Sequence, residues 1–202
     1  VLKILVGVGT KPRTRRPVMS WSSATPDLVS RAREELQLWP LDEHNAALLD
    51  AVHPRVWDGP AEADTVQMYD LIAVGAGAGG LVSSKQSARR GARSALISGH
   101  LAGGDCLNVG CVPSKGLLHC ARAAKEARTA LAEGFLVAGD GSSPTLKVEF
   151  GAVMARMRRL RAKIAPADSH EGTAAAGAHV YQGWGKFGEW YVPKTNINPQ
   201  QS

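Results

Sequence analysis

Residues 103–115, GGDCLNVGCVPSK, are the most informative stretch of this sequence. Cys106 and Cys111 enclose four residues, and Pro113 just beyond them marks the start of a helix that we expect to run to about Glu133. A thiolate at a helix N-terminus is stabilised by the helix dipole, which makes Cys111 a candidate reactive thiol. In a regular helix two cysteines five residues apart are not placed to form a disulfide, so we expect residues 107–110 to form an irregular loop.

A glycine-rich turn, residues 75–80 (GAGAGG), lies upstream of the cysteines. The apolar run 69–74 before it predicts a buried strand, residues 79–90 a helix, and residues 94–97 a second strand. In such a unit Gly75 permits a tight turn, Gly77 leaves room for a pyrophosphate, and Gly80 lets the helix pack against the strand. The phosphates would lie on the amides of the helix start. A glycine turn that binds nothing is the open alternative.

The glycine turn and the cysteine stretch, in this order, resemble the first third of the flavin-dependent disulfide oxidoreductases. These include mercuric reductase, dihydrolipoamide dehydrogenase and glutathione reductase, and residues 103–115 look most similar to the mercuric-reductase-like branch. The resemblance runs from about residue 69 to residue 187. It implies an α/β fold, a partial Rossmann-like FAD-binding domain with a GxGxxG turn. It implies FAD as the cofactor, bound by Gly75, Gly77, Gly79, Gly80, Ser98, Gly104 and Asp105.

The resemblance also assigns roles to three residues near the flavin. Cys106 would exchange with a disulfide substrate or reduce it, Cys111 would face the flavin as the charge-transfer thiolate, and Lys115 would lie close by. Two free buried thiols remain the alternative. No second cysteine pair or paired histidines lie nearby, so we predict no metal site. Cys120 matches no family role.

Ser98 departs from the dinucleotide-binding pattern. Such folds place Asp or Glu at the end of the second strand to bind the ribose hydroxyls. A serine makes a poorer clamp, and losing charge-assisted hydrogen bonds costs roughly 1.5–3 kcal/mol. FAD binding is therefore expected to be weakened but not excluded.

Three regions are predicted: an arm at 1–66, the partial FAD domain at 67–188, and a diverged tail at 189–202. In the arm, Thr25 and Asp42 open two short helices, and tryptophans stand at positions 21, 39 and 57. We expect the arm to be irregular, too polar to bury a core of its own, and ordered by contacts with other polypeptides. In the domain, residues 139–144 predict a turn, 152–165 a helix ended by Pro166, and 178–181 a third strand.

Composition narrows the setting. The net charge is +6, and three cysteines do not make a secreted disulfide framework. The longest apolar candidate, residues 71–82, is too short to span a bilayer. Residues 1–26 contain no acid, which fits either a transit-peptide remnant or a solvated basic tail. The basic run 156–163 is interpreted as a solvated helix face and not as a nucleic-acid site.

Family members are more than twice as long as this chain, and their NAD(P)H and dimerisation domains have no counterpart in its 202 residues. We therefore expect that the chain alone does not oxidise NADPH. The favoured hypothesis is an accessory subunit of a large organellar assembly, photosynthetic or respiratory, with a chloroplast favoured over a mitochondrion. The alternative is the FAD-binding fragment of an active mercuric-reductase-like NAD(P)H-dependent oxidoreductase, with the cytoplasm as the alternative location. Whether the chain is a natural short product or part of a longer protein stays open.

Overall fold

Three parallel strands in the order β1-β2-β3 form the centre of the fold: β1 (Leu71–Val74), β2 (Ser94–Ser98) and β3 (His179–Gln182). The computed structural model describes residues 20–22, 25–60, 67–136 and 146–185. Leu71 is paired with Ser94 across the first ladder, and Ala95 with His179 across the second. The β-strands with intervening helices confirm the α/β class, because parallel neighbours need crossover connections.

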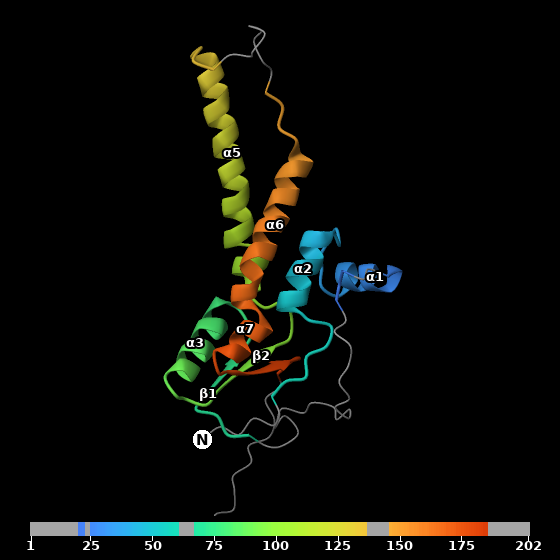
Figure 1. Cartoon of the computed structure of the whole chain (residues 1–202), viewed down its shortest axis with the longest axis vertical. Helices are drawn as coiled ribbons and strands as arrows, with labels where there is room; N and C mark the ends of the chain where they lie inside the picture. Colours follow the sequence, from blue (N-terminus) through green and yellow to red (C-terminus); the bar gives the residue numbers. More distant parts are fainter. Residues whose placement is uncertain (1–19, 23–24, 61–66, 137–145, 186–202) are drawn as a thin grey trace, which may run out of the picture.

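Five helices supply the crossovers (Figure 1). Between β1 and β2 lies α3 (Ala78–Arg89), and between β2 and β3 lie α4 (Gly104–Asn108), α5 (Cys111–Ala132), α6 (Phe150–Asp168) and α7 (His170–Ala175). α3 and α7 pack against the sheet and against each other. The helices α5 and α6 extend side by side away from the sheet and share a long contact. The glycine turn, the cysteines and the strand ends therefore lie at the base of this helix pair.

The two faces of the sheet contribute to different clusters, as the period-2 alternation of strands requires. Leu96 and Val180 join the large core, whereas Ala95, Ile97 and Tyr181 form a small cluster on the other face. All five residues of β2 are buried. In contrast, β1 is not the buried strand that its sequence predicts, since Val74 is 57% exposed. The reason is that β1 has only one neighbour in the described sheet.

The N-terminal arm packs on this chain's own domain. Of its helices, α2 (Glu43–Val52) packs along α6, and α1 (Pro26–Glu34) lies on the other side of α2 (Figure 1). The apolar residues of both helices share one core with β2, β3 and α6. Trp21 is fully buried and its Nε1 donates to the His53 carbonyl at 2.9 Å. Trp57 Nε1 donates to the Val180 carbonyl of β3, also at 2.9 Å.

The expectation that contacts outside residues 69–187 order the arm is therefore wrong. An ion pair between Arg158 of α6 and Asp42, 2.5 Å from Nε to Oδ2, adds to the attachment. Of the three arm tryptophans, only Trp39 is largely exposed, at 59%. The surface that covers the arm comes from α6 and β3, far along the sequence, and short-range patterns do not reveal it.

Local details correct several boundaries. Asp42 caps α2 as predicted, accepting from the Asn45 N–H, whereas Thr25 makes no side-chain cap. The helix α6 passes through Pro166 and ends at Asp168. A proline in a helix removes one N–H···O=C bond and crowds the carbonyl four residues earlier, and α6 ends two residues after Pro166. α5 begins at Cys111, two residues before the predicted start.

The predicted turn at 139–144 and the tail at 189–202 lie outside the described residues. The helix α7 was not predicted. Among the helices that the structure describes, none is both long and apolar enough to cross a membrane.

Candidate functional site

The glycine turn between β1 and α3 has the geometry of a close approach. Gly75 adopts φ 104°, in the region that favours glycine, and its N–H donates to the Ile97 carbonyl at 2.8 Å. A Cβ on Gly80 would lie 2.0 Å from the Gly75 carbonyl oxygen, so position 80 admits no side chain. A Cβ on Gly77 or Gly79 would meet nothing within 4 Å. Gly80 thus serves helix packing, and space remains open above Gly77.

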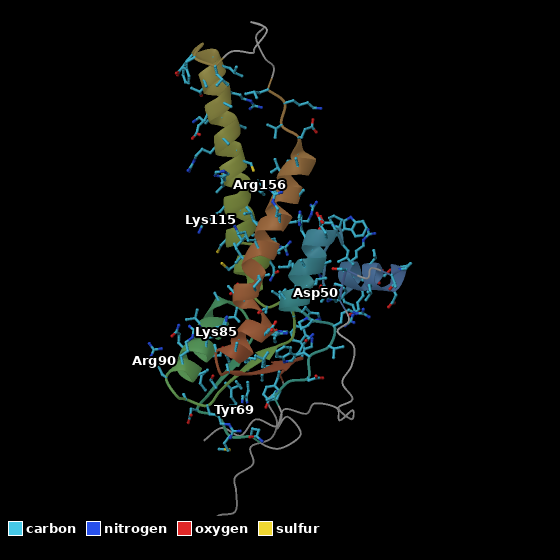
Figure 2. The ribbon with its side chains drawn as sticks, in the orientation of Figure 1. Asp50, Tyr69, Lys85, Arg90, Lys115 and Arg156 are labelled. Atoms are coloured by element: carbon cyan, nitrogen blue, oxygen red, sulfur yellow. The ribbon has the colours of Figure 1, made fainter. Side chains whose placement is uncertain are left out.

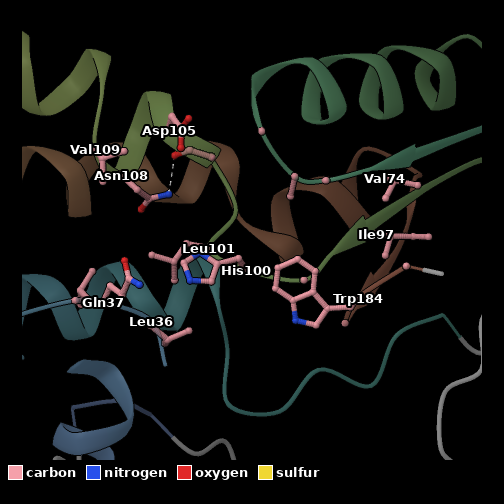
Figure 3. A pocket seen from close by; sticks show the side chains of 18 of the residues that line it. Leu36, Gln37, Val74, Ile97, His100, Leu101, Asp105, Asn108, Val109 and Trp184 are labelled. Carbon is pink, nitrogen blue, oxygen red and sulfur yellow. Dashed lines mark hydrogen bonds between the residues drawn. The ribbon is translucent and has the colours of Figure 1, made fainter. Parts of the chain in front are cut away.

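A cavity of about 680 Å³ lies at the C-terminal ends of the three strands. Of the residues that the sequence proposed for cofactor binding, four line the cavity (Gly75, Gly77, Gly104 and Asp105), whereas Gly79, Gly80 and Ser98 do not. In Figure 3, Leu36 and Gln37 of the arm lie on one side of the cavity and Asn108 and Val109 on the other. His100, Leu101 and Trp184 complete this view.

Ser98 is fully buried, and its hydroxyl donates to the His100 carbonyl at 3.2 Å. The residues that follow it, Gly99 and His100, reach the cavity instead. No carboxylate from the end of β2 therefore faces the ribose position that the fold family uses.

Sequence reasoning missed the arm and Arg161 as cavity residues. The loop from Leu36 to Trp39 forms part of the wall, and Gln37 there has a positive φ of 52°. Arg161 comes from α6, in the basic run that was interpreted as a solvated face. For Arg161 that interpretation is wrong, since it is 6% exposed. A polar residue on the apolar side of the helix, one turn after Met157, was the available signal.

The cysteine pair spans the junction of two helices. Cys106 lies in α4 and Cys111 is the first residue of α5. Between them the helix is broken at Val109 (φ −135°) and Gly110 (φ −112°, ψ −106°). The predicted irregular loop is thus shorter than expected, because residues 107–108 belong to α4. A Cβ on Gly110 would lie 2.9 Å from the Asp105 carbonyl oxygen, which ties this sharp turn to glycine.

The two thiols are free and adjacent. A hydrogen bond between the Cys106 and Cys111 side chains is the main reason that the pKa of Cys106 is raised. Burial and the charges of Cys111 and Asp168 raise it further, and only Lys115 opposes the effect. Lys115 is exposed on the first turns of α5 (Figure 2), and its positive charge acts on Cys106 from there.

Asp168, at the end of α6, is a neighbour of the cysteines that the sequence did not reveal. Burial raises the pKa of its carboxyl, and the nearby Lys85 of α3 opposes this shift. Lys85 Nζ donates to the Ala167 carbonyl at 2.5 Å. Two charged side chains therefore act on Cys106 in opposite directions: Lys115 lowers its pKa and Asp168 raises it. Among the described residues, no group of three or more His, Cys, Asp or Glu could hold a metal ion.

The cysteines give a first testable prediction. At neutral pH iodoacetamide should modify exposed Cys111 several-fold faster than Cys106, whose raised pKa keeps it protonated. Cys111→Ala should accelerate modification of Cys106, because it removes the hydrogen bond that raises the pKa. Mass spectrometry can follow both positions, with Cys120→Ser as a control that should change neither rate. An unchanged Cys106 rate in Cys111→Ala would contradict the hydrogen-bonded pair.

Comparison with known proteins identifies the class. Residues 69–186, more than half of the chain, match the pyridine nucleotide-disulphide oxidoreductase family, and the chain belongs to that family. Among curated proteins, a dihydrolipoyl dehydrogenase of Mycobacterium leprae is 45% identical over 78 residues, 37% of this chain and 16% of that protein. A glutathione reductase of Yarrowia lipolytica is 39% identical over 71 residues, 35% and 15% of the two chains.

A dihydrolipoyl dehydrogenase of Bacillus subtilis is 32% identical over 119 residues, 59% of this chain and 24% of that protein. The chain thus spans about a quarter or less of the length of these relatives. These matches confirm the recognised family, but they do not single out the mercuric-reductase-like branch.

Proposed function

We propose that this chain is the dithiol-bearing, FAD-binding part of a disulphide oxidoreductase. The observation that carries the proposal is that the glycine turn, Asp105 and Val109 line the same cavity, next to the cysteine pair. FAD would supply electron transfer between a nicotinamide and the dithiol. The open space above Gly77 fits a pyrophosphate on the start of α3, a helix of 12 residues. Gly75, Gly77 and Gly104 would hold the cofactor by their backbones.

The dithiol itself can carry out disulfide exchange. A thiolate of the pair attacks one sulfur of a substrate disulfide, forming a mixed disulfide and releasing the other substrate sulfur as a thiolate. The second cysteine then attacks the first, forming the Cys106–Cys111 bond and releasing the second substrate thiol. In sum, the substrate gains two electrons and two protons, and the pair loses them. Lys115 would stabilise the thiolate form, and Gly110 shapes the turn that brings the sulfurs together.

Gly77→Ala tests the cofactor site. The new methyl group meets no protein atom within 4 Å, and Gly77 has φ −78°, so the fold should tolerate it. It would, however, occupy the space of the pyrophosphate, and we expect FAD and ADP affinity to fall roughly tenfold or more. Fluorescence titration and calorimetry would measure this loss.

Gly79→Ala is the matched control, since its methyl also meets nothing within 4 Å and Gly79 does not line the cavity. It should leave FAD affinity nearly unchanged. If unaltered chain binds neither FAD nor ADP, or if both alanine variants bind like it, the cavity is not a dinucleotide site.

A second candidate is the accessory subunit of an organellar assembly, chloroplast more than mitochondrion. One observation favours it: Leu118 of α5, Phe150 at the start of α6 and Phe135, just beyond the end of α5, are exposed, Phe135 at 72%. Exposed apolar side chains in such numbers favour a covering polypeptide. The buried arm no longer supports the idea. If the purified chain contains no FAD, stays in a large complex, and leaves that complex when Phe135→Ser is introduced, the accessory role is favoured. If the chain is purified as a free flavoprotein, the accessory role is excluded.

A further inference from the structure

We infer that Arg161 is the phosphate-binding side chain of the cavity, and that it recognises the pyrophosphate of a dinucleotide. The inference rests on the proposed function, and it adds a positively charged side chain to the backbone amides of the glycine turn. Arg161 lies on α6, far in sequence from the turn, yet it lines the same cavity as Gly75 and Gly77.

Arg161 is a buried cation that forms no ion pair within the part of the chain that the structure describes. Its side chain is 6% exposed, and among the described residues no carboxylate lies within ion-pair distance of it. Arg158, one turn earlier on α6, already forms an ion pair with Asp42, 2.5 Å from Nε to Oδ2. Burial is the main reason that the pKa of Arg161 is lowered, the charge of Arg158 lowers it further, and the Asp42 carboxylate, which is already paired with Arg158, opposes the shift without reversing it. A buried guanidinium is costly unless it is paired, so the site favours an anion.

Most of the hydrogen-bonding capacity of Arg161 is unused. A guanidinium has five N–H donors. In the described structure one bond is formed, from Nη2 to Oδ1 of Asn108 at 3.3 Å, and Nε is buried with no partner. The planar fork of an arginine matches the oxygens of a phosphate, which makes such a group a suitable partner for the remaining donors.

A short chain of contacts connects Arg161 with the glycine turn. Asn108 accepts from Arg161 and donates through Nδ2 to the Gly104 carbonyl at 2.9 Å. Gly104 in turn touches the turn itself, since a Cβ on it would lie 2.7 Å from Gly77 Cα. Asn108 therefore links the guanidinium to the residue that packs against the glycine turn. Figure 3 shows Asn108 beside Asp105 at this edge.

The charge balance of the cavity supports the same conclusion. Among its described lining residues, Asp105 is the one carboxylate and Arg161 the one guanidinium or ammonium. The amides at the start of α3 alone would have to hold a pyrophosphate against the Asp105 charge. Arg161 offsets that charge and supplies directed donors, which is what a tight phosphate site requires.

Arg161→Met tests the assignment in the complete 202-residue chain. ADP and adenosine are the probes, titrated by NMR chemical shifts, because the two differ only in the diphosphate. We expect ADP affinity to fall roughly tenfold or more and adenosine affinity to stay unchanged. Without ligand, Arg161→Met should be no less stable than the unaltered chain, because it removes an unpaired buried charge.

Arg159→Met is the matched control, a change of the same charge on the exposed side of α6. It should alter neither affinity. Arg161→Lys keeps the charge without the planar fork, and we expect it to bind ADP with intermediate affinity. This variant tests the assignment even if Arg161→Met does not fold.

The outcomes separate the inference from the proposed function. If the unaltered chain binds neither probe, the dinucleotide site fails and the Arg161 assignment fails with it. If the chain binds ADP and Arg161→Met binds it equally well, only the assignment is overturned. Equal loss of ADP and adenosine would make Arg161 a structural residue and would also overturn it.

Discussion

At pH 4.5 the protein should be about 2.5 kcal/mol less stable than at pH 7 through one buried side chain, His170. His170 is fully buried, and neither ring nitrogen has a hydrogen-bond partner in the described structure. Burial, and secondarily the charge of His53, lowers its pKa from 6.5 to about 4. Between pH 6.5 and about pH 4, His170 binds a proton in the unfolded chain but stays neutral in the folded chain. Stability is therefore fully present above pH 6.5 and is lost as the pH falls toward 4.

His170→Leu should flatten this pH dependence. The ring centres of His170 and Trp57 are 5.4 Å apart, and a leucine of similar size would fill this space. The substitution removes two unpartnered nitrogens and leaves nothing to protonate at this position. Urea unfolding at pH 7 and pH 4.5, followed by tryptophan fluorescence, measures the difference.

Two other groups act on the same profile and should persist in the variant. Burial also lowers the pKa of His53, which adds to the acid loss, whereas the raised pKa of Asp168 works in the opposite direction. If His170→Leu loses as much stability on acidification as the unaltered chain, His170 is not the titrating group.

The central βαβ unit was predictable because its signals are local. The role of each glycine in the turn, at positions 75, 77 and 80, depends on atoms only a few residues away. Gly80, for example, packs so closely on the Gly75 carbonyl that no side chain fits there. The same holds for Asp42 as a helix cap and for Cys111 at a helix start. Such features depend on neighbouring residues and need no knowledge of the tertiary fold.

The cavity wall was not predictable for the opposite reason. Gln37 and Arg161 reach it only because α2 packs on α6, and that packing joins segments more than a hundred positions apart. A basic run on a helix has the same sequence pattern whether one arginine faces solvent or a cavity. The arm was misjudged similarly, since its apolar stripes are short and the surface that covers them is assembled from the far end of the chain.

The arm gives the largest expected effect. Leu49→Ala should lower the free energy of unfolding by about 2–5 kcal/mol, because it leaves a hole in a fully buried part of the core. The core around Leu49 includes Leu96 of β2 and Val180 of β3. The loss should therefore be shared by the strands, and amide hydrogen exchange should accelerate in β2 and β3 as well as in α2.

Trp39→Ala is the matched change on the same arm. Trp39 is 59% exposed, and the Arg33 guanidinium lies 5.3 Å from its ring centre. Its loss should cost about 1 kcal/mol or less. By the same reasoning, deletion of residues 1–58 should destabilise the domain, because Trp57 and α2 leave the core together. If Leu49→Ala speeds exchange in the arm alone and leaves β2 and β3 protected, the arm is a separate unit, and its role as an interface for another polypeptide regains support.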